Sequence, residues 1–116
     1  MRHQKNKVTL DRKRGPRKAL LRSLAENLVL NEKIVTTKAK AKAARSLVER
    51  LVTKAKTNSL AVRRQLMSTL YTKKAIDKLL TELGPRYVER KGGYTRIIVT
   101  KNRVGDGAEE AIIEFV

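Results

Sequence analysis

Cysteine is absent from this chain, and histidine occurs once, as His3. Without cysteine the protein has neither a disulfide framework nor a thiolate zinc site. A single histidine also argues against a histidine-based catalytic triad and against a multi-histidine metal site. Apolar runs are short as well, because none approaches the roughly 20 residues that a membrane-spanning helix needs.

Aromatic residues make up only 3% of the chain, so its core must be mainly aliphatic. So few rings are too few for an extended platform on which single-stranded bases stack. The basic N-terminus has no apolar stretch behind it and is therefore not a secretory signal. These features fit a cytoplasmic protein without a membrane partner.

Acidic residues are also few. The chain has eleven Asp or Glu against 28 Lys or Arg, which gives a net charge of +17. Such a charge favours polyanionic partners, nucleic acid first and anionic membrane surfaces second. The 116 residues suit one domain, and an apolar fraction of 41% is enough for a modest core.

The positive charge is concentrated in the first half of the chain. Residues 1–56 hold seventeen basic and four acidic side chains, whereas residues 57–116 hold eleven and seven. Residues 1–15 have few apolar side chains and cannot form a core segment. We therefore expect an extended basic arm over 1–15 that a polyanion orders, followed by a single domain over 16–116.

Apolar residues at three- and four-residue spacing predict four helices in this domain. The first covers about 16–31, with Pro16 at its first position. The second covers about 38–56, and its exposed faces carry lysine and arginine with a single acid, Glu49. A short third helix starts near residue 60, and a fourth covers about 73–83 and ends at Gly84-Pro85.

Short β-branched runs predict three strands, at 33–37, 94–100 and 111–115. The last two flank the turn signal at residues 105–107 and form a long hairpin connection. Two strands alone are marginal, so we expect the first strand to join them. The predicted fold class is α+β, a two-layer domain of about four helices on a small three-stranded mixed sheet.

No catalytic constellation emerges from the sequence. The clustered acids Asp106, Glu109 and Glu110 fall in or beside a predicted loop, where solvated carboxylates are usual. Gly92-Gly93 opens a strand and lacks the Lys-Ser/Thr pair of a phosphate-binding loop. We therefore predict no enzyme activity, no cofactor, no metal and no small-molecule substrate. Dispersed cations without base-reading motifs favour phosphate-dominated binding, which suits folded RNA.

An ordered set of short motifs gives a more specific indication. They are Met1-Arg-His3, Ile34-Val-Thr-Thr37, Lys40-Ala-Lys42, Leu83-Gly-Pro-Arg-Tyr87, Gly92-Gly-Tyr-Thr-Arg-Ile97, Gly105-Asp-Gly107 and Ile113-Glu114. Together they resemble the bacterial large-subunit ribosomal protein seventeen family over essentially the whole chain. Two places depart from the family pattern: Ala43 stands where Glu is usual, and Arg14-Gly-Pro-Arg17 where Ser-Ser-His-Arg is common.

This resemblance implies a structural protein of the large ribosomal subunit with an α+β fold. It implies that the partners are large-subunit ribosomal RNA and neighbouring large-subunit ribosomal proteins. It further implies a location near the exit of the peptide tunnel, with the N-terminal arm most deeply embedded in RNA. The alternatives are an architectural DNA-binding protein, which shares the charge, and a surface-active membrane binder.

Three groups of side chains are the candidate RNA contacts. The arm supplies Arg2, His3, Lys5, Lys7, Arg12, Arg14, Arg17 and Lys18. The start of the second helix supplies Thr37, Lys38, Lys40, Lys42 and Arg45. The segment before and within the hairpin supplies Arg90, Tyr94 and Arg96.

Overall fold

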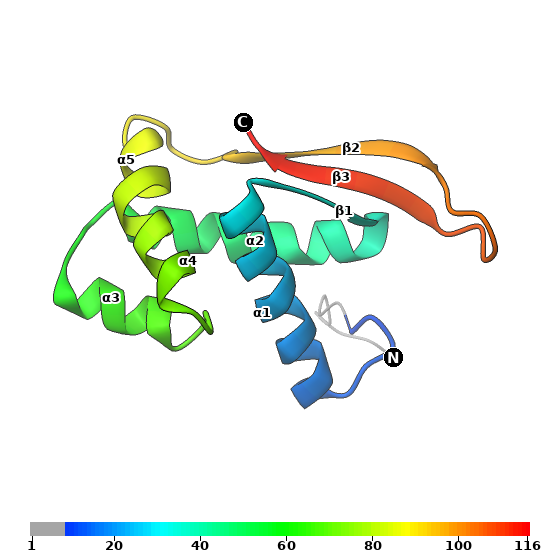
Figure 1. Ribbon diagram of the computed structural model, residues 1–116, viewed down its shortest axis with the longest axis horizontal. Helices are drawn as coiled ribbons and strands as arrows, with labels where there is room; N and C mark the ends of the chain where they lie inside the picture. The colour runs from blue at the N-terminus through cyan, green and yellow to red at the C-terminus, as the bar shows by residue number, and fades with distance from the viewer. Residues whose placement is uncertain (1–8) are drawn as a thin grey trace, which may run out of the picture.

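The computed structural model describes residues 9–116. Helices and a three-stranded sheet form two layers, as Figure 1 shows. In chain order the elements are α1 (Arg14–Asn31), β1 (Lys33–Thr37), α2 (Lys38–Ala55), α3 (Leu60–Met67), α4 (Lys73–Lys78), η1 (Leu79–Leu83), α5 (Gly84–Arg86), β2 (Thr95–Asn102) and β3 (Glu109–Phe115). The predicted two-layer α+β class is confirmed.

The strand order is β1-β3-β2, and both pairings are antiparallel. The expectation of a mixed sheet is therefore wrong. The reason is the order of the strands. β1 and β2 run parallel to each other, but β3 lies between them. A parallel pair needs the two strands to be neighbours, and here the last strand takes the central place.

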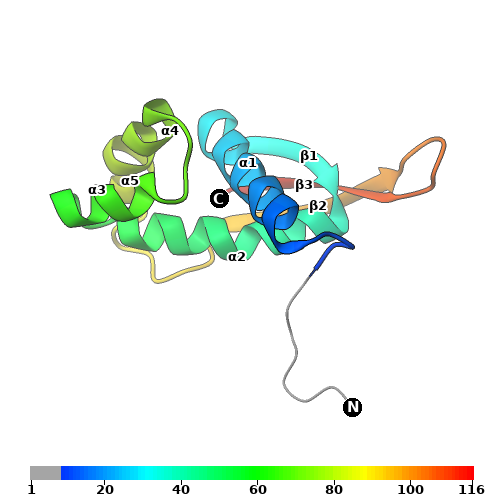
Figure 2. The same ribbon diagram turned by 90° about the horizontal axis from the view of Figure 1, so that it is seen from below.

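One face of the sheet packs on the helices. The inner row across the sheet is Ile34, Ile113 and Ile97, all part of the core or packed against it. α2 lies along this face and contributes buried side chains at helical spacing: Ala41, Ala44, Val48, Leu51, Val52 and Ala55. Figure 2 shows α1 crossing α2. The aliphatic core that the composition predicts is confirmed, with a small aromatic cluster at one end.

The aromatic cluster closes the end of the sheet where β2 begins. The rings of Tyr87 and Tyr94 are 5.3 Å apart, and that of Phe115 is 6.2 Å from Tyr87. The Tyr87 hydroxyl donates a 2.6 Å hydrogen bond to the carbonyl of Val116. These contacts join the last residues of β3 to the segment that follows α5.

Helical structure continues from Lys73 to Arg86, past the Gly84-Pro85 pair that the sequence predicts as its end. The π-turn η1 makes this possible. The Gly84 N–H bonds to the carbonyl of Leu79, five residues back, so that Pro85 starts a new helical turn. Gly84 is buried against the end of α2, where a Cβ would overlap the carbonyl oxygen of Ala55.

The first helix begins at Arg14, two residues earlier than expected. Pro16 is then the third helical residue, where an amide N–H still has no partner within the helix, so its ring is tolerated. The starts of α2, α3 and α4 agree with the prediction. Thr37, Ser59 and Thr72 each cap a helix by accepting a hydrogen bond from a backbone N–H three residues on.

The β2–β3 hairpin extends beyond the helices, at the right of Figure 1. Its turn lies at the predicted Gly105-Asp106-Gly107, where both glycines have positive φ. Arg103 forms an ion pair with Asp106, and this pairing raises the pKa of the arginine and lowers that of the aspartate. A short, internally paired turn therefore ends the hairpin.

Candidate nucleic-acid interface

A basic groove lies where α1 crosses α2. Its volume is about 480 Å³, and the connection between α3 and α4 forms its third wall. The α1 residues that line it are spaced i, i+3 and i+4, and the α2 residues are spaced i, i+4 and i+7, so each set lies on one face of its helix. The lining residues are Lys18, Leu21 and Arg22 from α1, Ala43, Leu47 and Arg50 from α2, and Ser68 and Thr69 from the connection.

The chemistry of this groove suits a phosphate group. Three cations and two hydroxyl groups line it, and no carboxylate of the described residues does. The Arg50 Nε donates a 3.3 Å hydrogen bond to the carbonyl of Ser46, which directs its guanidinium along α2. Guanidinium, ammonium and hydroxyl donors are the groups with which proteins hold nucleic-acid phosphates.

A carboxylate on α1 holds the third wall of the groove in place. Glu26 Oε1 accepts two 2.7 Å hydrogen bonds from Thr72, one from its N–H and one from its hydroxyl. Thr72 in turn caps α4, so one acid fixes both the connection and the start of that helix. The buried side chains of Leu66 and Leu70 anchor the connection on either side of Ser68 and Thr69.

The acid of α2 is directed away from the groove. Glu49 Oε2 accepts hydrogen bonds from the hydroxyl of Thr95 at 2.8 Å and from Nε of Arg45 at 3.3 Å. It therefore joins α2 to β2 and neutralises one cation on the helix. Arg50, the next residue along, stays exposed without a carboxylate partner among residues 9–116.

Three of the five predicted contacts at the start of α2 line a second hollow of about 550 Å³, and Lys40 and Arg45 lie outside it. Thr37 and Lys38 line it together with Lys42 and Glu109. Lys38 pairs with Glu109 at 3.6 Å, so this hollow is less positive than the groove. Thr37 acts as the N-cap of α2, and its hydroxyl accepts a hydrogen bond from the N–H of the half-buried Lys40. Lys42 is exposed.

The third predicted group does not form one surface. Arg90 is exposed in the segment before β2, and its Nε donates to the carbonyl of Gly92 at 3.2 Å. Arg96 lies on the outer face of the sheet, 2.7 Å from Glu114. Only 1% of the Tyr94 surface is exposed. The core covers the ring, and this burial argues against the predicted contact between Tyr94 and RNA.

Tyr94 has a structural part instead. Its hydroxyl donates to the carbonyl of Arg90 at 3.3 Å and lies 3.2 Å from the hydroxyl of Thr53 on α2. The Lys56 ammonium is 4.8 Å from the ring centre. The interaction with Lys56, and then that with Thr53, lowers the pKa of Tyr94. This tyrosine fixes the segment that carries Arg90 against the end of α2.

Four residues of the predicted arm, Arg2, His3, Lys5 and Lys7, lie outside the described residues. Arg12 and Arg14 are exposed, and Arg17 is half-buried in α1. The first turn of α1 contains no acid, and the side chain of Lys13 does not cap it. A run of cations thus leads along the chain to Lys18 and the groove, with no acidic residue from position 12 to position 22.

Arg22 and Arg50 are absent from the candidates that the sequence suggested. The spacing within each helix is visible in the sequence. Arg22 lies four residues after Lys18 on α1, and Arg50 lies three residues after Leu47 on α2. The sequence does not indicate which stripe of α1 meets which stripe of α2, since that depends on the angle at which the helices cross. The structure brings the two stripes together.

Two other features are not found in the part of the chain that the structure describes. Among residues 9–116, no three His, Cys, Asp or Glu side chains gather as metal ligands would. Over those residues, too, every helix is too short or too polar to cross a lipid bilayer.

Comparison with known proteins agrees with the resemblance seen in the sequence. Residues 20–116 match the family described as ribosomal protein L17. Large ribosomal subunit protein bL17 of Hydrogenobaculum sp. (strain Y04AAS1) is 54% identical, covering 100% of this chain and 99% of the relative. The proteins of the same name from Sulfurihydrogenibium sp. (strain YO3AOP1) and Gemmatimonas aurantiaca are 48% and 49% identical, and the alignments cover 97% and 98% of those relatives. The chain therefore belongs to the ribosomal protein L17 family.

Proposed function

We propose that this chain is a structural constituent of the large ribosomal subunit and binds large-subunit ribosomal RNA in the cytoplasm. The relatives that match over nearly their whole length carry the name of a large-subunit protein. The observation that carries RNA binding is the groove, in which Lys18, Arg22 and Arg50 converge without an acid among the described residues. The neighbourhood of the peptide-tunnel exit and contact with adjacent ribosomal proteins remain predictions from the family.

The proposed mechanism is neutralisation of phosphates by fixed cations. RNA repels itself where two of its helices approach, and a rigid set of cations between them offsets this repulsion. Lys18 and Arg22 come from one helix of the protein and Arg50 from another. A phosphate in the groove would thus link α1 to α2, and the exposed Arg12 and Arg14 would extend the contact along the RNA backbone.

Sedimentation of cell lysate at low salt and again near half-molar salt tests the proposed function. A protein held only by about 6–10 non-specific phosphate contacts loses roughly 10³–10⁵ in affinity between 50 and 200 mM salt. We expect this chain to stay with the large subunit at high salt, near one copy for each particle. The double variant Arg12→Glu and Arg14→Glu should lose in competition with the wild type for incorporation.

Two results would contradict the proposal. The protein could leave the large subunit at high salt, or it could follow DNA until nuclease removes that DNA. The second result would favour the architectural DNA-binding alternative. Equal incorporation of the double variant and the wild type would count against a role of Arg12 and Arg14 in RNA binding.

A further inference from the structure

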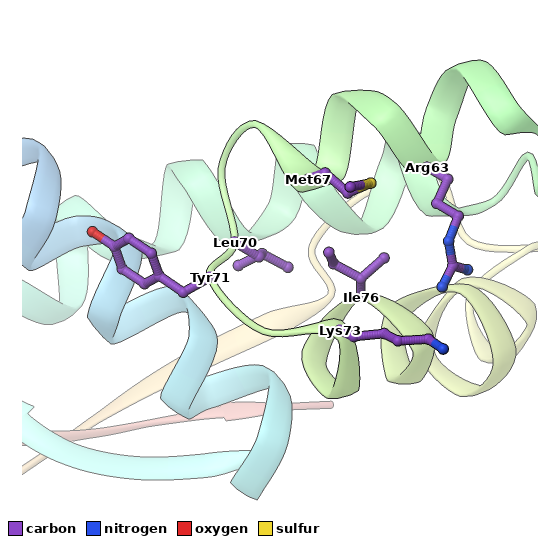
Figure 3. A pocket seen from close by; sticks show the side chains of 6 residues that line it. All are labelled: Arg63, Met67, Leu70, Tyr71, Lys73 and Ile76. Carbon is purple, nitrogen blue, oxygen red and sulfur yellow. The ribbon is translucent and has the colours of Figure 1, made fainter.

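An apolar pocket of about 460 Å³ lies between α3 and α4, and it shares no lining residue with the basic groove. Figure 3 shows Met67, Leu70 and Ile76 around its centre. Leu70 and Ile76 are nearly buried and form its floor, whereas Met67 is 60% exposed and Tyr71 58% exposed. Large apolar side chains left open beside a hollow are typical of a surface that another molecule covers.

The charge around this pocket is positive. Arg63 and Lys73 lie together at one end of it in Figure 3. Arg63 is already paired with Asp77. Lys73 is exposed and has no carboxylate within salt-bridge distance among residues 9–116. Lys74, next in sequence, is also exposed but does not line the pocket.

We infer that this pocket docks a segment of a partner protein in which an apolar side chain stands next to Asp or Glu. The apolar side chain would cover Leu70 and Ile76 and remove Met67 from water. The neighbouring carboxylate would meet the Lys73 ammonium at the rim. Apolar anchors in a pocket with complementary charge at the edge are the usual composition of a protein interface.

Two other occupants fit less well. A second copy of this chain would bring its own basic rim against Arg63 and Lys73, and like charges repel. A nucleotide base would find no hydrogen-bonding group on the Leu70 and Ile76 floor. The pocket's one aromatic ring, Tyr71, lies at the end opposite Arg63, and the guanidinium of Arg22 lies 5.9 Å from its centre. One face of that ring is thus already occupied.

Site-specific photo-crosslinking in bacterial cells that depend on this chain tests the inference. Met67 is replaced by p-benzoylphenylalanine, the cells are irradiated, and the crosslinked peptides are identified by mass spectrometry. We expect a crosslink to a protein, at an apolar residue within about three positions of Asp or Glu. The same photo-probe at Ala61, exposed on α3 but outside the pocket, should give no such product.

Charge reversal then separates docking from chance proximity. Lys73→Glu in the Met67 photo-probe chain should lower the crosslink yield by at least about threefold, since a surface ion pair of up to about 1 kcal/mol corresponds to roughly fivefold. Lys74→Glu, matched in charge and exposure, should leave the yield unchanged. If the Met67 chain is not produced in folded form, Tyr71 at the other end of the pocket carries the photo-probe.

Several outcomes would overturn the inference. They are a crosslink to RNA, a crosslink to a second copy of this chain, a protein crosslink without nearby acids, and a yield no higher than that from Ala61. Since the readout is the crosslinked peptide and not sedimentation, failure of the proposed ribosomal function would leave this test intact.

Discussion

The hydroxyl of Thr95 donates a 2.8 Å hydrogen bond to Oε2 of Glu49, the one acidic residue of α2. Thr95 is buried and Glu49 half-buried, so the bond lies at the contact between the helix and the sheet. It gives the carboxylate a structural part on the sheet side of α2. Arg50, the cation of α2 that lines the groove, therefore has no carboxylate partner among residues 9–116.

Breaking this bond should lower stability without removing the groove. Glu49→Gln keeps the shape but replaces a charged acceptor, and hydrogen bonds to charged groups contribute about 1.5–3 kcal/mol. Because Glu49 is partly exposed, we expect a loss of about 1–2 kcal/mol in the free energy of unfolding, measured by urea denaturation. Glu82→Gln, an exposed change of the same kind, should have little effect. Equal values for the two variants would refute the structural part of Glu49.

The two glycines Gly84 and Gly15 should respond in opposite ways to alanine. In Gly84→Ala the new Cβ would lie 2.9 Å from the carbonyl carbon of Ala55 and closer still to its oxygen, so α2 and α5 must move apart. Overpacking of this kind costs about 1–3 kcal/mol. Gly15 lies in the first turn of α1, and an alanine methyl group there would have open space around it. Alanine at this position should favour the helix by up to about 1 kcal/mol. Thermal unfolding of both variants measures the contrast.

An acid placed in the groove should weaken RNA binding. In Ser68→Glu the carboxylate would stand beside Lys18, Arg22 and Arg50 and pair with the cations that a phosphate would otherwise meet. The slope of log affinity against log salt concentration should become shallower by roughly 0.7–0.9 for each phosphate that the variant no longer neutralises. Ala61→Glu on α3 adds the same charge outside the groove and is the control. Identical slopes for the two variants would exclude the groove as the phosphate site.

Tyr94→Phe tests whether this residue is structural. The hydroxyl interacts with the carbonyl of Arg90 and with Thr53, so its removal should cost about 1 kcal/mol of unfolding free energy. RNA affinity measured by filter binding should stay unchanged, because the ring is buried. A fall in affinity with unchanged stability would instead identify Tyr94 as a direct RNA contact.

The ion pairs of Glu32 should make stability depend on pH in the acid range. The hydrogen bond from Arg86 lowers the pKa of Glu32, with a smaller effect from Lys78, while desolvation opposes both. The ordinary pKa of a glutamate is about 4.3. A group with a lowered folded pKa stabilises the protein above that value, and this contribution is lost as the pH falls through the folded pKa.

Glu32→Gln should therefore lower stability at pH 7 and have less effect near pH 2. The carboxylate is partly exposed, so the difference should stay below about 1 kcal/mol. Urea denaturation of both proteins at the two pH values measures it. A difference that grows as the pH falls would contradict the sign of this linkage.

Local signals in the sequence located most of the fold. The alternating run 33–37 is β1 to the residue, and the Thr37 and Thr72 side chains cap the helices that follow them. Each of these features depends on neighbours within four residues, which a sequence displays directly. The antiparallel order of the sheet depends instead on pairing between residues 33–37 and 110–114, and no local pattern indicates that pairing.

The candidate site shows the same division. The positive charge of α1 and α2 is visible in the sequence. The burial of Tyr94 is not, because a tyrosine next to two glycines at a strand end gives no sign of the core above it. Gly84-Pro85 predicts a helix end because both residues usually break helices. The π-turn before it, which begins at Leu79, has no distinctive composition.

The central place of β3 has a consequence for the order in which the protein can fold as it is synthesised. β1 and β2 do not pair with each other, and each forms its backbone ladder only with residues of β3. Until that segment has emerged, both strands present unpaired backbone edges, and the apolar face of α2 has no sheet to cover it. Folding of this chain therefore has to wait for nearly its whole length, and a nascent chain halted before residue 109 would remain a target for chaperones and proteases.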